Sequence, residues 1–175
     1  MTQKTRAISL SALLSALTVV SLFFASVWPT GLFGLVAFSS LFVAAAAIES
    51  GIVYGIYVFV VSSALGMLIL PDKAAPVLFI LFFGYYPVLK NLFERVKPAP
   101  VQWILKLAVF NAALTVLWFL LKDLFFSFGE DMPGIILIYL MGNAVFAVFD
   151  YGYSKVLLFY MDRVSKYKNK QRKNR

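Results

Sequence analysis

Apolar residues fill the chain in long runs, separated by short polar or proline-containing segments. The runs cover roughly residues 7–26, 33–48, 52–70, 75–93, 101–126 and 134–159. About 20 apolar residues are enough for a helix to cross the hydrocarbon core of a bilayer. We therefore predict an all-α polytopic membrane protein, a bundle of six transmembrane helices that forms a single integral membrane domain over residues 1–175.

Polar and aromatic side chains recur at one helical spacing in the last two runs. The offsets are 0, 4, 7 and 11, which an α-helix places within an arc of roughly 60°. The set in run 101–126 is Asn111, Thr115, Trp118 and Lys122, and the set in run 134–159 is Tyr139, Asn143, Phe146 and Asp150. Polar groups inside a bilayer normally face the bundle interior, a neighbouring helix or a water-filled cavity. The two stripes therefore predict a shared interior site, in which all of these residues except Asp150 bind a substrate.

Several of these residues have a second interpretation. Asn111 and Asn143 fall near the same depth, so an amide pair could simply hold the two helices together, at about 1 kcal/mol. Lys122 could bind an acidic group of a ligand or extend to the outer headgroups. Asp150 falls near the inner surface, where Lys90 or Lys106 could neutralise it, as a structural group or as part of a gate. Phe110 is expected to point away from the stripe.

Two further aromatic residues are candidates for the substrate site. Trp28 lies in the proline- and glycine-containing turn after the first run, where it is either an interfacial anchor or a lid on a ligand. Tyr86 precedes Pro87, which cannot donate a hydrogen bond to the carbonyl of Phe83 and should kink the fourth helix. The kink is either a cavity wall or a bend in a packed aromatic helix.

Lysine and arginine mark one side of the membrane, since short cytoplasmic loops are enriched in them. They precede the first run, flank the turn between the fourth and fifth runs, and follow the sixth run. With six spans, all three places lie on the same side, so both termini are predicted to be cytoplasmic. The net charge of +8 mostly reflects this topology. The basic tail 160–175 can lie on anionic lipid, and we expect no nucleic-acid partner.

Composition then excludes several chemistries. Hydrophobic residues make up 62% of the chain and the mean hydropathy is +0.86, which leaves almost no room for an extramembrane domain. The chain has no cysteine and no histidine, so thiolate catalysis, zinc sites with these ligands and histidine relays are excluded. A phosphate-binding Walker sequence is also missing. We expect no enzyme activity, no catalytic residue, no metal and no cofactor.

Small residues line one face of the first run. Ser9, Ala12 and Ala16 share this face, and the Ala12–Ala16 pair has a spacing that lets another helix approach closely. The face either packs inside the bundle or docks a separate subunit.

These features together resemble a known family. Six helices in under 200 residues, the basic lead-in to the Ala12–Ala16 pair, the first turn containing tryptophan, proline and glycine, and the basic tail are similar to the substrate-binding S component of an energy-coupling factor (ECF) vitamin transporter. The resemblance implies a multi-pass protein of a bacterial cell membrane that captures a small water-soluble vitamin or related compound near the outer face. It also implies that Ser9, Ala12 and Ala16 contact a transmembrane coupling subunit, and that two cytoplasmic ABC ATPases drive the complex.

The cobalt and nickel branch of this family relies on a histidine near the N-terminus, so its absence here disfavours a metal substrate. The residues alone also fit a small membrane assembly or structural protein, or a channel, that has no substrate pocket. In that case the two polar stripes only pack against each other.

Overall fold

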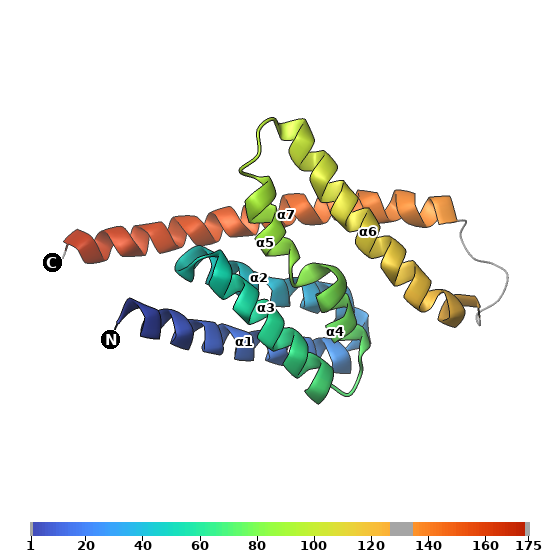
Figure 1. The fold of residues 1–175 in the computed structure, drawn as a ribbon, viewed down its shortest axis with the longest axis horizontal. Helices are drawn as coiled ribbons and strands as arrows, with labels where there is room; N and C mark the ends of the chain where they lie inside the picture. Colours follow the sequence, from blue (N-terminus) through green and yellow to red (C-terminus); the bar gives the residue numbers. More distant parts are fainter. Residues whose placement is uncertain (1, 127–134, 174–175) are drawn as a thin grey trace. The chain divides into compact units, whose positions relative to one another are not determined.

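The fold is entirely helical in the part of the chain that the computed structural model describes, which is residues 2–126 and 135–173 (Figure 1). Long helices are α1 (Gln3–Val27), α2 (Leu32–Ser50), α3 (Ile52–Ile69), α6 (Ala99–Phe126) and α7 (Ile135–Lys173). The short helix η1 (Pro29–Gly31) joins α1 to α2. Six helical stretches among the described residues are long and apolar enough to cross a membrane. The prediction of an all-α polytopic membrane protein with six spans is confirmed.

Contacts divide the chain into two compact units, Met1–Val109 and Phe110–Arg175. The boundary falls inside α6, so the second unit consists of most of α6 together with α7.

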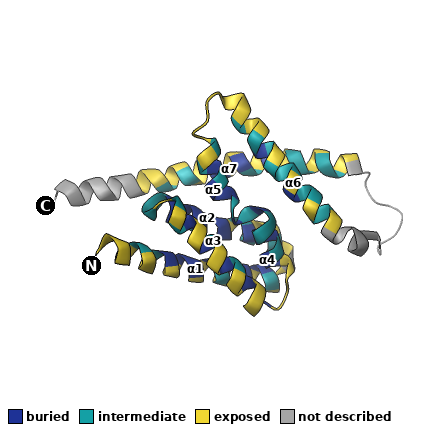
Figure 2. Ribbon diagram, viewed as in Figure 1, coloured by how far each residue is buried: buried dark blue, intermediate teal, exposed yellow. Residues whose placement is uncertain are grey.

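Helix α1 of the first unit turns small hydroxyl side chains inward and several large apolar side chains outward. On α1 the buried residues include Ser11, Ser15, Thr18 and Ser21, whereas Leu13 is 59% exposed (Figure 2). Thr18 satisfies its hydroxyl by donating to the carbonyl of Leu14 on its own helix, at 2.8 Å. Since hydrocarbon gives no reason to bury large apolar groups, small residues at helix contacts are expected in membrane proteins.

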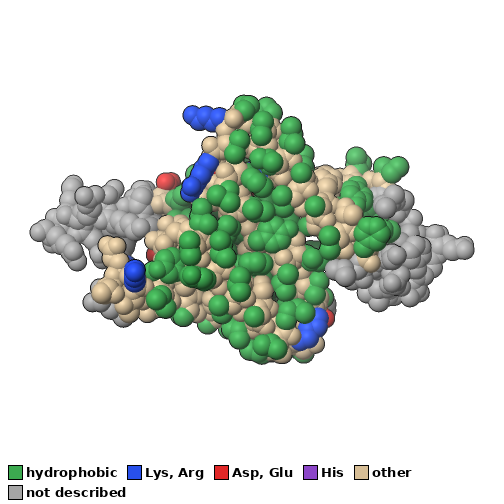
Figure 3. Space-filling model, in the orientation of Figure 1, with side chains coloured by type: hydrophobic (Ala, Val, Ile, Leu, Met, Phe, Trp, Pro, Cys, Tyr) green, Lys and Arg blue, Asp and Glu red, His purple; other side chains and the backbone are tan. Residues whose placement is uncertain are grey.

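The exposed surface has the character that a lipid environment requires. Hydrophobic side chains cover most of the visible face of the molecule (Figure 3). The large apolar side chains that are most exposed include Leu68, at 79%, and Ile136, at 82%. Such a surface would aggregate in water, so the exposure itself supports a protein that sits in a bilayer.

The fourth span is interrupted, as Pro87 predicts. It consists of α4 (Ala74–Leu78), the π-helix η2 (Phe79–Phe83) and α5 (Tyr86–Phe93). The interruption begins upstream of Pro87, because the amide of Gly84 donates to the carbonyl of Phe79, five residues back, at 2.7 Å. The widened turn is closely packed: a Cβ atom at Gly84 would lie 2.6 Å from the ring of Phe59 on α3. These contacts favour a bend in a packed aromatic helix over a cavity wall.

Helix α7 is longer than the sequence pattern predicted. The apolar run ends near residue 159, but the helix continues without a break to Lys173. Its 39 residues rise about 58 Å at 1.5 Å per residue, roughly twice the thickness of the hydrocarbon core. The basic segment is therefore helical up to that residue.

Candidate functional site

The centre of the second unit is a reciprocal amide pair. Asn111 on α6 donates to the side-chain oxygen of Asn143 on α7 at 2.9 Å, and Asn143 donates back at 3.0 Å. Asn143 also donates to the carbonyl of Tyr139, one turn earlier, at 2.8 Å. The two stripes therefore meet at Asn111 and Asn143, as predicted. The contact is an amide pair between the two helices, which was one of the two interpretations of these asparagines.

The contact between α6 and α7 along the two stripes is called the α6–α7 seam. One helical turn beyond the amide pair, two hydroxyl groups meet along this seam. Thr115 donates to the backbone carbonyl of Asn111 at 2.7 Å. Its single proton is then committed, so the hydroxyl of Tyr139 is the donor in the 2.6 Å contact between Thr115 and Tyr139. Four residues of the stripes therefore form one continuous hydrogen-bonded chain, in which each polar group has a partner.

The aromatic end of the seam corrects one prediction. Phe146 is almost fully buried, and its ring stacks on that of Phe110, with centroids 4.6 Å apart and planes 12° apart. Phe110 therefore packs against a stripe residue, and the prediction that it points away was wrong. The close approach depends on Gly142, where a Cβ atom would lie 3.2 Å from Leu114. With no side chain at residue 142, α7 comes near enough to α6 for the rings to stack.

The other end of the α6 stripe is more open. Trp118 is half-buried, so its ring can contact both protein and a neighbouring molecule. Lys122 lies within α6, but its side chain is outside the described part of the structure, and its two interpretations both stand as predictions.

Two predicted site residues belong to the first unit. Trp28, at the end of α1, is 67% exposed, as an interfacial anchor would be. Tyr86 is fully buried, with its ring 4.9 Å from that of Phe82. Both residues belong to the first unit and the stripe residues to the second, so the role of Trp28 and Tyr86 in a substrate site is still a prediction.

The predicted docking face is open. Ser9, Ala12 and Ala16 are all exposed, while α1 packs its opposite side against α2 and α3. The face is exposed within the first unit, and its two interpretations, packing inside the bundle and docking of a separate subunit, both stay predictions. The small face is available to a neighbour.

A charged cluster that the sequence reading did not identify lies at the end of α5. Lys90 and Lys106 are almost fully buried, and both contact the same carboxylate oxygen of Glu94, at 2.8 and 3.2 Å. The spacing of four residues between Lys90 and Glu94 was the available signal. Asp150 is also buried, in the second unit, and its predicted neutralisation by Lys90 or Lys106 stays a prediction.

The groups gathered along the α6–α7 seam are amides, hydroxyls and aromatic rings. Such groups can hold a neutral polar or aromatic molecule or can bind two helices together, but they supply no nucleophile or general base of ordinary strength. Among the side chains that the structure describes, no three acidic, cysteine or histidine groups come close enough to hold a metal ion. Comparison with protein families, with characterised proteins and with solved structures finds no match to this chain.

We expect the amide pair to stabilise the contact between α6 and α7 measurably. In a double-mutant cycle on the purified protein in detergent, Asn111→Ala and Asn143→Ala should each lower the free energy of unfolding. The coupling energy between them should be about 0.6–1.7 kcal/mol, the range of side-chain hydrogen bonds in membrane proteins. Asn91→Ala, which removes a half-buried asparagine on α5 whose side-chain oxygen accepts from Arg95, is the control. Strictly additive effects would mean that the pair contributes nothing to stability.

Proposed function

We propose that this chain is the membrane-embedded substrate-binding subunit of an ATP-driven importer of the ECF type. In this proposal it captures a small water-soluble vitamin or related compound at the outer face of the membrane. A transmembrane coupling subunit and two cytoplasmic ABC ATPases then drive release to the cytoplasm. The six spans are consistent with such a subunit, and the absence of a Walker sequence means that the driving force must come from a partner or an ion gradient.

The observation that carries the proposal is the exposure of Ser9, Ala12 and Ala16 on α1. Helices that meet only lipid gain nothing from small side chains, whereas helices that pack against another protein use them to bring the backbones close. Large apolar side chains flank the small face, with Ile8 61% and Leu17 39% exposed. A shallow strip between larger side chains is the shape that accepts a helix of another subunit.

The proposed substrate class is based on Trp118 and Lys122 of the α6 stripe. Trp118 is half-buried, and a tryptophan in that position can cover the flat face of a conjugated ring. Lys122, four residues further along α6, would add an ammonium group that donates to an acidic group of the substrate. A flat, water-soluble compound with an acidic substituent fits both residues.

A specific observation favours the alternative, a membrane assembly or structural protein without a pocket. The polar groups of Asn111, Thr115, Tyr139 and Asn143 bind one another. A binding site usually offers some polar groups to its ligand, so this seam is equally suited to hold two helices together. The two functions differ in whether any small molecule binds.

Thermal stabilisation by a ligand distinguishes the two functions. A ligand that binds only the folded protein raises the melting temperature, and the rise grows with ligand concentration. We expect at least one compound in a screen of vitamins and their precursors to stabilise the purified chain in this way. Trp118→Ala should then weaken the binding of that compound by about ten- to a hundredfold, because it removes an aromatic contact worth roughly 1–3 kcal/mol.

The matched control is Val148→Ala, which shortens a side chain that is 74% exposed on α7 and should leave ligand affinity unchanged. A screen in which no compound stabilises the protein would favour the structural alternative. Equal affinities of the wild type and Trp118→Ala would place the substrate site elsewhere in the chain.

A further inference from the structure

The exposed face of α7 changes character along the helix. Between Ile136 and Val148 the strongly exposed large side chains are all apolar. From residue 151 onward, exposed aromatic and cationic side chains alternate every four residues, and we call this set the cation–aromatic ribbon: Tyr151, Lys155, Phe159 and Arg163. A spacing of four residues advances only about 40° around an α-helix. The ribbon therefore follows one side of α7.

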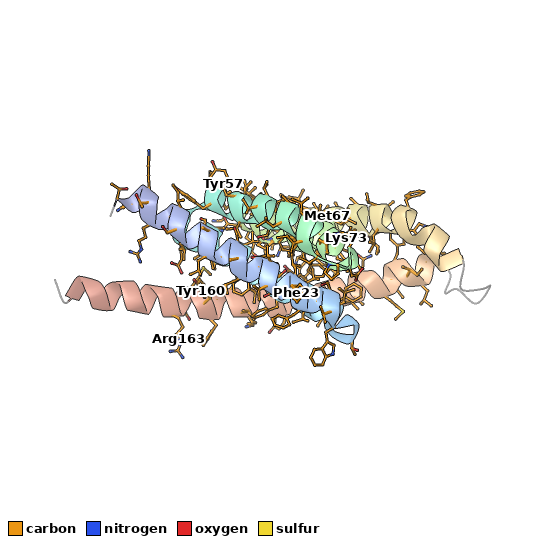
Figure 4. All side chains as sticks on the ribbon, turned by 90° about the horizontal axis from the view of Figure 1, so that it is seen from below. Phe23, Tyr57, Met67, Lys73, Tyr160 and Arg163 are labelled. Atoms are coloured by element: carbon orange, nitrogen blue, oxygen red, sulfur yellow. The ribbon has the colours of Figure 1, made fainter. Side chains whose placement is uncertain are left out.

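Each cation of the ribbon is held over an aromatic ring one turn away. The ammonium of Lys155 lies 5.3 Å from the ring centre of Tyr151, and the guanidinium of Arg163 lies 5.2 Å from that of Phe159. The rings of Tyr151 and Phe159 are 64% and 62% exposed, and Figure 4 shows Arg163 projecting outward from helix α7. Contacts of this kind restrain a long flexible cation, so each charge is already positioned before anything binds.

The ribbon lies at the depth of lipid headgroups. From Ile136 to Lys155 the helix rises about 29 Å, which matches the hydrocarbon core of about 30 Å. Arg163 lies about 12 Å further along, and the headgroup layer on each side is about 5–8 Å thick. If the exposed apolar face spans the core, Lys155 and Arg163 lie on either side of the phosphate layer, with Phe159 between them. Aromatic side chains are enriched at this level of membrane proteins.

The local charge favours anionic lipids over zwitterionic ones. Between Tyr151 and Lys173 the sequence has seven lysine and arginine residues against a single acidic residue, Asp162, for a net charge of 7 − 1 = +6. Since α7 is helical to Lys173, the backbone rises about 15 Å beyond Arg163. Much of this segment is therefore within about one Debye length, 8–10 Å, of the headgroup surface.

We propose that the cation–aromatic ribbon of α7 is a binding site for the headgroups of anionic phospholipids, in the leaflet that meets the basic end of this helix. Lys155 and Arg163 bind the phosphates, while Tyr151 lies on the acyl-chain side of Lys155 and Phe159 lies among the headgroups. A soluble acidic protein would have no use for aromatic rings at this depth. The proposal is independent of the transport function.

The test compares two lipids on the full chain in detergent micelles. Palmitoyl-oleoyl phosphatidylglycerol (anionic) and palmitoyl-oleoyl phosphatidylcholine (zwitterionic) are titrated separately, and tryptophan fluorescence reports thermal unfolding. The anionic lipid should raise the melting temperature at lower concentration than the zwitterionic one. Lys155→Gln and Arg163→Gln should each weaken the apparent affinity for the anionic lipid about fivefold, and the double variant about 25-fold. The response to the zwitterionic lipid should not change.

Lys97→Gln is the control, because it removes one exposed cation from the turn before α6 and lies outside the ribbon. Its affinity for the anionic lipid should equal that of the wild type. The proposal is overturned if Lys97→Gln weakens the affinity as much as Lys155→Gln, if the ribbon variants bind like the wild type, or if the two lipids stabilise the protein equally. Equal stabilisation by inorganic phosphate would also overturn it, since the lipid would then be unnecessary.

Discussion

Uptake of the substrate should fall to background when Ala12 or Ala16 is replaced by leucine, while binding of the substrate by the isolated chain is unchanged. Both alanines are exposed, so the larger side chains cause no clash with the described part of the chain. A leucine would hold a neighbouring helix away from the backbone of α1 and disrupt the close packing that small residues allow. The measurement is transport by cells that express the chain together with its coupling subunits, beside ligand titration of the purified chain.

Two controls separate docking from folding. Ala64→Leu makes the same change at an exposed alanine of α3 and should leave uptake intact. Ala46→Leu makes it at a fully buried alanine of α2 and should lower the melting temperature, because overpacking a core destabilises it. Normal uptake by Ala12→Leu and Ala16→Leu would exclude α1 as the docking face. If Ala12→Leu and Ala16→Leu instead lower the melting temperature as much as Ala46→Leu does, the small face of α1 is a packing surface of this chain.

The sequence is sufficient to predict the six spans, because the requirement for apolar residues in hydrocarbon is strong and local. It also predicts the meeting of Asn111 with Asn143, since the helical period and the depth of each residue fix which groups face one another. The interruption of the fourth span follows from Pro87 in the same way. Each of these predictions depends on a rule that acts within one helix or between two consecutive helices.

Predictions that depend on how closely two helices approach were less successful. The predicted direction of Phe110 was wrong, because Gly142 lets α7 come near enough to α6 for Phe110 and Phe146 to stack. The helical period of the sequence cannot give the distance between two helices. The π-helical turn at Phe79–Phe83 was not predicted either, since Pro87 explains a break but not its upstream position. Similarly, a hydropathy run marks where a helix leaves the core, so it could not show that α7 continues to Lys173.

The distance between two helices also identifies a sensitive position in the first unit. A Cβ atom at Gly55 of α3 would lie 2.8 Å from the Cβ of Ala47 and 3.3 Å from the carbonyl oxygen of Val43, both on α2. Neither atom is the flexible end of a side chain, so the contact can be relieved only by moving one helix away from the other. The small residues of α2 and α3 thus keep two backbones in direct contact, as expected where helices pack inside a bilayer.

We therefore expect Gly55→Ala to lower the free energy of unfolding by about 1–3 kcal/mol, and Gly55→Leu to prevent accumulation of the folded protein. Gly34→Ala is the matched control, since it makes the same change near the start of α2, where a Cβ atom meets nothing within 4 Å. That variant should be neutral or more stable, by up to about 1 kcal/mol, because alanine is the better helix former. Thermal unfolding of the purified variants in one detergent gives the comparison. If both substitutions change stability in the same direction and by the same amount, the close contact between α2 and α3 does not limit the stability of the bundle.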